Sequence, residues 1–170
     1  EVAFSMVNRV SAQGVDKLLN LVAGVTPLTT PTSHSQPAVA AVVLDETSTV
    51  EADFDTADDI DAITTDGIYT SGATTYKVAA PCAVTVDGSV VKVAITSFFF
   101  TALPADNGAV TPKKPKYVLL YIVQGSSEFG DNATNIPLAL FQPDFVGTPP
   151  DGTNYTLTFP TTGAIRLETA

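Results

Sequence analysis

The chain has 170 residues, 45% of them hydrophobic and 15% charged, which is long and apolar enough to bury the core of one domain. Eight basic residues against eighteen acidic ones give a formal net charge of −10, and this excess of negative charge disfavours nucleic acid and anionic membranes as partners. No apolar run approaches the ~20 residues that span a bilayer, and the single cysteine, Cys82, excludes an intrachain disulfide.

The first predicted element is a short helix within residues 11–24. Apolar residues recur there at the spacing of one helix face, and Gly24 is suited to end the helix. The next stretch, residues 26–37, combines three prolines with many Ser and Thr residues, which predicts an exposed and extended arm. We therefore divide the chain into an N-terminal helix and arm, residues 1–35, and a β domain, residues 36–170.

From the β-domain boundary onward the pattern is that of strands. A continuous apolar run at 38–45 and an alternating run at 48–54 predict two strands joined by a turn. Asp87-Gly88 between two β-branched runs predicts a two-residue hairpin. Further strands are predicted at 76–80, 82–86, 89–95, 97–103, 116–125, 136–142, 154–159 and 164–169. This series predicts an all-β fold, an antiparallel sandwich or a jelly-roll-like barrel.

Residue types that catalyse reactions are scarce. The one histidine, His34, lies in the predicted arm, and no P-loop, dinucleotide, serine-hydrolase or zinc-protease motif occurs. Cys82 has apolar neighbours and no nearby base, which predicts a small buried side chain and not a reactive thiol. The sequence therefore predicts a protein that is not an enzyme and that needs no cofactor.

Residues 51–67 carry seven carboxylates and no basic residue. An EF-hand needs a glutamate at its twelfth position, but a loop counted from Asp53 has Thr64 there. An irregular calcium site is one interpretation, because carboxylates are the hard oxygen ligands that calcium prefers. A solvated acidic loop without a metal is the simpler one. The candidate calcium ligands are Asp55, Asp58, Asp59 and Asp61.

The basic residues are more localised than the acidic ones. Three of the eight, Lys113, Lys114 and Lys116, stand directly before the most apolar predicted strand. One interpretation is that these charges protect a strand edge from pairing with other chains. The other is a contact with the acidic face of a neighbouring copy, since separated acidic and basic stretches suit self-assembly.

Three consecutive phenylalanines, Phe98, Phe99 and Phe100, occur on one predicted strand. Because side chains alternate along a strand, the three cannot all face one core. Either Phe99 or the other two must therefore find a second apolar surface, in another layer of the domain or in another subunit. Together with the three lysines, these residues are the interface candidates, and they predict a homo-oligomer, with a trimer favoured.

Three segments of the C-terminal third form a series of short motifs. They are KPKYVLLYIVQGSS, NIPLALFQPDF and AIRLE, which together extend from Lys114 to Glu168. The series resembles a module of bacteriophage tail-fibre, baseplate and head-fibre proteins, in which a strand, a glycine turn, a second strand and a closing stretch with an arginine follow one another. Val118 stands where that module has an aspartate. The resemblance implies a β-rich, usually trimeric attachment protein and identifies no catalytic residue.

These observations together predict a non-enzymatic structural protein located in a virion. We expect a capsid decoration protein first, because a small acidic domain with a separable arm suits docking onto a shell, where the arm would become ordered. A tail-fibre or head-fibre attachment module is the alternative in the same class. A secreted carbohydrate-binding or adhesin domain is the alternative from another class. The expected partners are further copies of the chain and other capsid or tail proteins.

Overall fold

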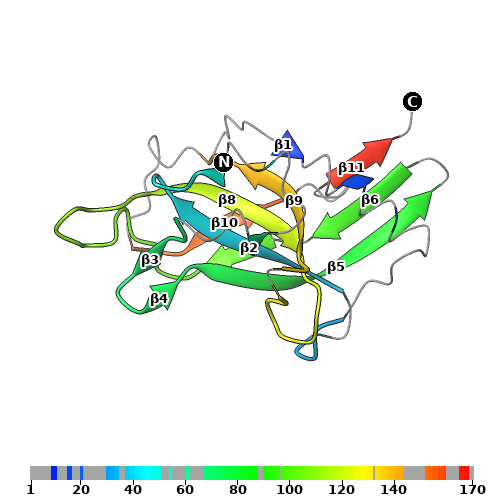
Figure 1. The fold of residues 1–170 in the computed structure, drawn as a ribbon, viewed down its shortest axis with the longest axis horizontal. Coiled ribbons are helices and arrows are strands. Elements are labelled where there is room, and N and C mark those ends of the chain that lie inside the picture. Colours follow the sequence, from blue (N-terminus) through cyan, green and yellow to red (C-terminus); the bar gives the residue numbers. More distant parts are fainter. Residues whose placement is uncertain are drawn as a thin grey trace.

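The computed structural model describes residues 9–10, 15–16, 20, 30–34, 37–50, 54, 60–61, 67–87, 90–95, 97–131, 133–143, 152–159 and 165–168. Within these ranges the chain is built from antiparallel strands with almost no helix, which confirms the predicted all-β class (Figure 1). The strands are β1 (Arg9–Val10), β2 (Ala38–Asp45), β3 (Thr70–Ser71), β4 (Thr74–Thr75), β5 (Lys77–Asp87), β6 (Val90–Ile95), β7 (Ser97–Phe100), β8 (Pro115–Ile122), β9 (Ile136–Phe141), β10 (Tyr155–Thr158) and β11 (Ile165–Glu168).

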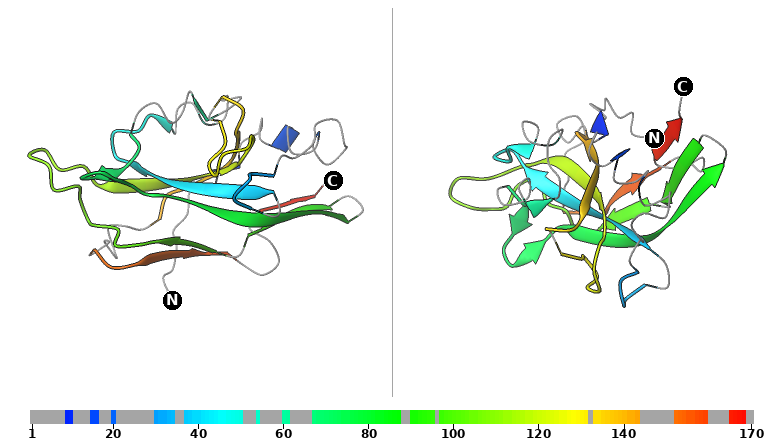
Figure 2. Two further views of the ribbon diagram at one scale, coloured as in Figure 1. Left: turned by 90° about the horizontal axis from the view of Figure 1, so that it is seen from below. Right: turned by 45° about the vertical axis from the view of Figure 1, so that its right-hand side comes forward.

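Seven of these strands form one sheet in the order β1-β9-β8-β2-β5-β6-β11. Two further pairs, β10-β7 and β3-β4, make small two-stranded sheets. The β7-β10 pair lies beneath the large sheet as a second layer (Figure 2, left). The fold is therefore a curled antiparallel sandwich in which one layer is much larger than the other.

β2 lies in the middle of the large sheet, and both of its faces are buried. Val39 and Val43 belong to one core cluster, and Val42 and Leu44 belong to the cluster on the opposite face. Since side chains alternate along a strand, a strand that is buried on both faces needs apolar residues at every position. This requirement explains the uninterrupted apolar run predicted as a strand at 38–45.

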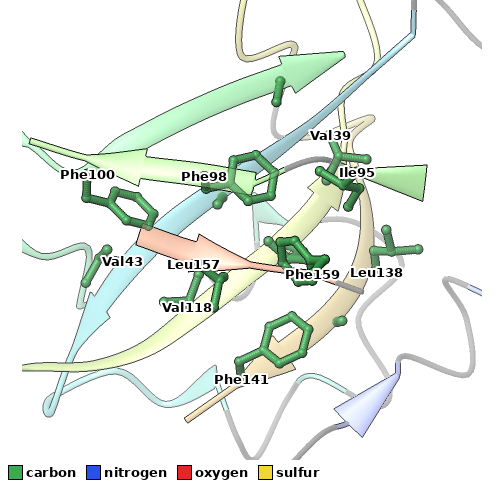
Figure 3. Close-up of a cluster of buried hydrophobic side chains, with 14 of the residues drawn as sticks. Val39, Val43, Ile95, Phe98, Phe100, Val118, Leu138, Phe141, Leu157 and Phe159 are labelled. Atoms are coloured by element: carbon green, nitrogen blue, oxygen red, sulfur yellow. The ribbon is translucent and has the colours of Figure 1, made fainter. Parts of the chain in front are cut away.

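The core between the two layers is aromatic on the side of the small sheet. Phe98 and Phe100 of β7 and Leu157 of β10 point toward the large sheet and are almost completely buried (Figure 3). The Phe98 ring meets Phe159 edge to face, with 5.9 Å between the ring centroids and an interplanar angle of 89°. Such edge-to-face pairs add specific stabilisation to the burial of apolar area.

The second core lies on the other face of the large sheet. There Leu119 and Leu140 pack with apolar side chains from connecting segments. Val50, Phe54 and Ile60 are the buried contributors from the connection after β2. The middle of the large sheet, at β2, β8 and β9, is therefore covered on both faces, by strands below and by connecting segments above.

The predicted hairpin between β5 and β6 is confirmed, with a register that differs from the prediction by one residue. Asp87 pairs with Val90, so residues 88 and 89 connect the strands, in place of Asp87-Gly88. β5 also continues through Pro81, where the sequence predicted two separate strands. The Cys82 N–H points toward β2 and donates to the Pro37 carbonyl. Because successive nitrogens along a strand point to opposite sides, the nitrogen of Pro81 faces away from β2, and the proline removes no hydrogen bond to that strand.

The prediction of a strand at 48–54 is wrong for the residues of this segment that the structure describes, 48–50 and 54. The Phe54 N–H donates to the Val50 carbonyl over 2.9 Å, a bond typical of a helical turn. Val50 and Phe54 both lie in the second core, four residues apart. That spacing fits one side of a helix as well as one side of a strand, so alternation alone gave the wrong element.

The predicted helix and arm are described only in part. Val15, Asp16 and Asn20 are helical, and no helix within the described ranges has the length and apolar character to cross a bilayer. β1 was not predicted, and its pairing with β9 makes residues of the N-terminal segment 1–35 part of the large sheet. In the same segment, the Thr32 N–H donates to the Ser126 carbonyl over 3.0 Å. Among the described residues, the β1–β9 pairing and the hydrogen bonds from Thr32 to Ser126 thus connect residues 1–35 to the β domain.

Phe98→Ala should lower the free energy of unfolding by about 3–5 kcal/mol, because it opens a cavity in the core between the layers. Phe99→Ala, on the outward side of the same strand, should cost less than about 1 kcal/mol. Urea denaturation of both variants in dilute solution measures the difference. Equal losses would contradict the assignment of the two side chains to opposite sides of β7.

Candidate interaction surface

The connection between β7 and β8, residues 101–114, projects beyond the ends of the strands (Figures 1 and 2). Its apex, residues 108–112, is exposed throughout. Val110 at the apex is fully exposed, and Val110 and Phe99 are the large hydrophobic side chains exposed within the described part of the chain. Because Val110 projects into solvent from a loop whose ends are fixed, we treat this connection, the β7–β8 loop, as the first candidate surface.

Two buried tyrosines hold the start of the β7–β8 loop. The Tyr76 hydroxyl donates to the Ala102 carbonyl and the Tyr69 hydroxyl donates to the Pro104 carbonyl, each over 3.1 Å. Leu103 between them is buried, and its N–H donates to the Thr153 carbonyl over 3.0 Å. Burial, followed by the charges nearby, raises the pKa of Tyr69 to about 12, so this hydroxyl remains a donor at neutral pH.

The apex of the β7–β8 loop is closed by Asn107. Its side-chain oxygen accepts hydrogen bonds from the N–H groups of Lys113 and Ala109, at 3.0 and 3.3 Å, and its own N–H donates to the Lys113 carbonyl. Gly108 has a φ of +68°, a backbone conformation that glycine adopts without steric cost. The loop therefore presents Val110 from a backbone that is already organised.

A buried carboxylate fixes the returning end of the same loop. Asp45 is 1% exposed at the end of β2, and its Oδ2 lies 3.4 Å from the Lys113 ammonium. Its Oδ1 accepts a hydrogen bond from the Thr47 N–H at 2.8 Å, and the Lys113 ammonium also donates to the Thr47 hydroxyl. A buried charge without such partners would be costly, so Asp45 and Lys113 specify how the loop returns to the sheet.

The three lysines predicted as interface candidates have different surroundings. Lys113 forms an ion pair with Asp45, and the Lys116 ammonium lies 4.7 Å from the centroid of the Tyr117 ring. Lys114 is exposed next to the loop apex. Of the three, Lys114 is the exposed one, and its carbonyl accepts a hydrogen bond from the Glu46 N–H, so an acidic residue stands beside it.

The three phenylalanines divide as the alternation rule requires. Phe98 and Phe100 are buried in the chain's own core, so their prediction as residues of an intersubunit interface is wrong. Phe99 is 49% exposed on the outward side of β7 and remains available. Of the three phenylalanines, Phe99 is therefore the one whose side chain lies outside the core of the chain and can contact a second apolar surface.

Of the four candidate calcium ligands, one lies in the described part of the chain. Asp55, Asp58 and Asp59 lie outside the described residues, and Asp61 is exposed. No group of three or more His, Cys, Asp or Glu side chains that could hold a metal ion occurs among the residues that the structure describes. The N–H of His34 donates to the Pro31 carbonyl in a turn beside the loop of residues 124–135.

A half-buried lysine lies between two aromatic rings on the second-core face of the large sheet. The Lys77 ammonium is 4.8 Å from the Phe129 ring centroid and 5.4 Å from the Tyr121 ring centroid. Burial lowers the pKa of Lys77, and the aromatic faces offset part of that desolvation. The Tyr121 hydroxyl is buried without a hydrogen-bond partner among the described residues, and burial raises its pKa.

Cys82 lies in the core between the layers and is 3% exposed. Burial raises the pKa of its thiol to about 11. A thiol that stays protonated at neutral pH is a poor nucleophile, and this confirms the prediction of a small buried side chain.

No family model matches the chain, and no curated protein or solved structure matches it either. Its function is therefore inferred from the geometry and the charge of its surface.

Two features that define the β7–β8 loop were not predicted from the sequence. Val110 is a single apolar residue among Gly, Ala, Thr and Pro, so no periodicity marks it. The pairing of Asp45 with Lys113 joins residues far apart in the sequence, and only the antiparallel pairing of β2 with β8 brings them together. One available signal was the pair Asp106-Asn107 before Gly108, a composition typical of a tight turn.

Tyr121→Phe should leave the protein unchanged or stabilise it by about 1 kcal/mol, because the mutation removes a buried hydroxyl that has no partner. Tyr69→Phe is the matched control, and it should destabilise by about 1 kcal/mol because it removes the bond to Pro104. Urea midpoints of both variants at pH 7 give the comparison. A larger loss for Tyr121→Phe than for Tyr69→Phe would show that the Tyr121 hydroxyl has a stabilising partner.

The free energy of unfolding should fall as pH rises from about 9 to about 11. The unfolded thiol ionises near pH 9 and the folded thiol near pH 11, so in this window ionisation favours the unfolded chain. The contribution of Cys82 is about 2 kcal/mol at the upper end. Cys82→Ala should show a correspondingly smaller decline between pH 8 and pH 10.5 in urea titrations. Parallel declines would mean that the thiol does not cause the pH dependence.

Proposed function

We propose that the protein is a non-enzymatic structural protein of a bacteriophage particle, a capsid decoration protein that docks through its β7–β8 loop. The observation that carries the proposal is Val110, a fully exposed apolar side chain at the apex of a loop whose two ends are fixed by hydrogen bonds and an ion pair. The resemblance of residues 114–168 to virion attachment modules supports the same class of protein.

A loop of this kind suits docking energetically. Binding through a flexible loop would cost about 0.5–1.5 kcal/mol for each rotamer-rich side chain that becomes ordered, whereas the bonds of Asn107 and the Asp45–Lys113 pair order this loop beforehand. An apolar residue that fills a pocket of the partner supplies the central contact around which polar groups exclude water. Val110 is in the position to supply that contact.

The positions of the lysines also indicate that the protein docks through the end that carries the β7–β8 loop. The chain has a net charge of −10, yet Lys113, Lys114 and Lys116 all stand where the β7–β8 loop returns to the sheet. Lys113 is paired with Asp45, so Lys114 and Lys116 are the lysines here that can attract a negative surface, and such charges orient the approach and raise the association rate. The expected partner is therefore a capsid surface that offers an apolar pocket bordered by carboxylates.

Immunogold electron microscopy tests the location directly. Antibodies raised against the purified chain are applied to particles of the phage that encodes it. Labelling distributed over the head is expected for a decoration protein. Labelling confined to the tail or the tail tip would replace this proposal by a fibre or baseplate role, and particles without label would overturn a virion location.

Val110→Asp should weaken binding to particles grown without the protein by at least tenfold, because the mutation places a charge in the apolar contact. Cosedimentation of purified protein with these particles measures the binding. Ala133→Asp adds the same charge to another exposed loop and should bind as the unchanged protein does. Equal binding of all three proteins would show that the β7–β8 loop is not the docking site.

A further inference from the structure

The outward side of the β7-β10 pair carries an exposed aromatic ring beside a hollow. Phe99 is 49% exposed and borders a hollow of about 190 Å³. The hollow lies between β7 and the segment that leads into β5, and its lining consists of Thr74, Thr75, Tyr76, Lys77, Val78, Phe99, Phe100 and Thr101. An exposed ring next to an empty hollow is an arrangement that two identical surfaces can satisfy reciprocally.

We propose that a second copy of this chain docks on this face, around a twofold axis, with each Phe99 ring entering the hollow of the other copy. The same surface then serves on both copies, which is the usual geometry of a homodimer. This proposal is separate from capsid docking, which uses the β7–β8 loop. It also differs from the trimer that the sequence favoured.

The size of the hollow fits the ring that would enter it. An apolar protein cavity of about 150 Å³ admits a benzene molecule. The hollow here is about 190 Å³, so its volume is large enough for one aromatic ring. The Phe99 ring of the second copy would lose its exposed apolar area there. Aromatic side chains buried at the centre of an interface contribute a large share of the binding energy.

The distribution of charge along the chain favours a second copy as the molecule that binds at this face. With a net charge of −10, two copies repel each other over most of their surfaces. The segments that form this face, residues 68–76, 97–105 and 152–159, contain no charged residue. On β10, Thr156 stands directly opposite Phe99, and Thr158 stands opposite Ser97, so the ring is surrounded by neutral hydroxyl groups. A neutral face is where two copies of an acidic protein meet at the lowest electrostatic cost.

Lys77 is the charged residue in the lining of the hollow, and its ammonium group points away from the β7-β10 face. Lys77 follows β4 and belongs to β5, but its ammonium lies over the rings of Tyr121 and Phe129. Tyr121 belongs to the core on the opposite face of the large sheet from the β7-β10 pair. Two copies docked through the β7-β10 face would therefore not bring two ammonium groups together.

Analytical ultracentrifugation of the full chain from dilute to concentrated solution tests the proposal. We expect a reversible equilibrium between the 17.7 kDa monomer and a species of twice that mass. Phe99→Asp and Thr156→Asp should each raise the dissociation constant at least tenfold, since both place a carboxylate in the contact between two acidic copies. Ala133→Asp adds the same charge outside this face, and its dissociation constant should be unchanged.

Circular dichroism melting in dilute solution should show that the Phe99 and Thr156 variants remain folded, because both side chains are exposed. A monomer at every concentration would overturn the proposal. A trimer, or a dimer that Phe99→Asp leaves intact, would overturn it too. The particle cosedimentation of Val110→Asp tests capsid docking on its own, so failure of one proposal is distinguishable from failure of the other.

Discussion

The central strands of the large sheet, β2, β8 and β9, must be covered on both faces, and the packing of the other elements depends on this constraint. All eight residues of β2 are buried, and β8 and β9 are buried along nearly their whole lengths. A strand of this composition is stable only between two apolar layers. The β7-β10 pair supplies one layer, and connecting segments with Val50, Phe54 and Ile60 supply the other. With these central strands covered, the exposed large hydrophobic side chains of the described residues are Val110 in a loop and Phe99 on the outer side of the small sheet.

The same constraint explains how much of the fold could be predicted from the sequence. Strands that are buried on both faces read as continuous apolar runs, so β2, β8 and β9 were found with nearly correct ends. β1, β3 and β4 have two residues each, too few to show any period. The segment 48–54 was assigned to the wrong element because its apolar residues satisfy two periods at once. The hydrogen bond from Phe54 to Val50 decides between them, and it depends on the core that the segment covers.

For the candidate surfaces, alternation along β7 predicted that the phenylalanines would divide between two sides. It could not predict which side is the core, because that depends on β10 and on the large sheet, which are distant in the sequence. The β7–β8 loop was predicted only as a polar connection bearing lysines. Its fixed shape comes from Tyr69, Tyr76 and Asp45, and their bonds to the loop all join residues from separate parts of the chain.

The two proposed surfaces are physically adjacent, because β7 leads directly into the β7–β8 loop. Tyr76 belongs to both, since it lines the hollow beside Phe99 and its hydroxyl holds the Ala102 carbonyl at the start of the loop. A substitution at Tyr76 or Phe100 would therefore disturb both surfaces, as well as the core. Phe99 and Val110 point away from the core, and Thr156 is exposed, so changes at these positions alter one surface at a time. Self-association that shifts Tyr76 would in turn move the base of the loop, which gives the two surfaces a direct structural connection.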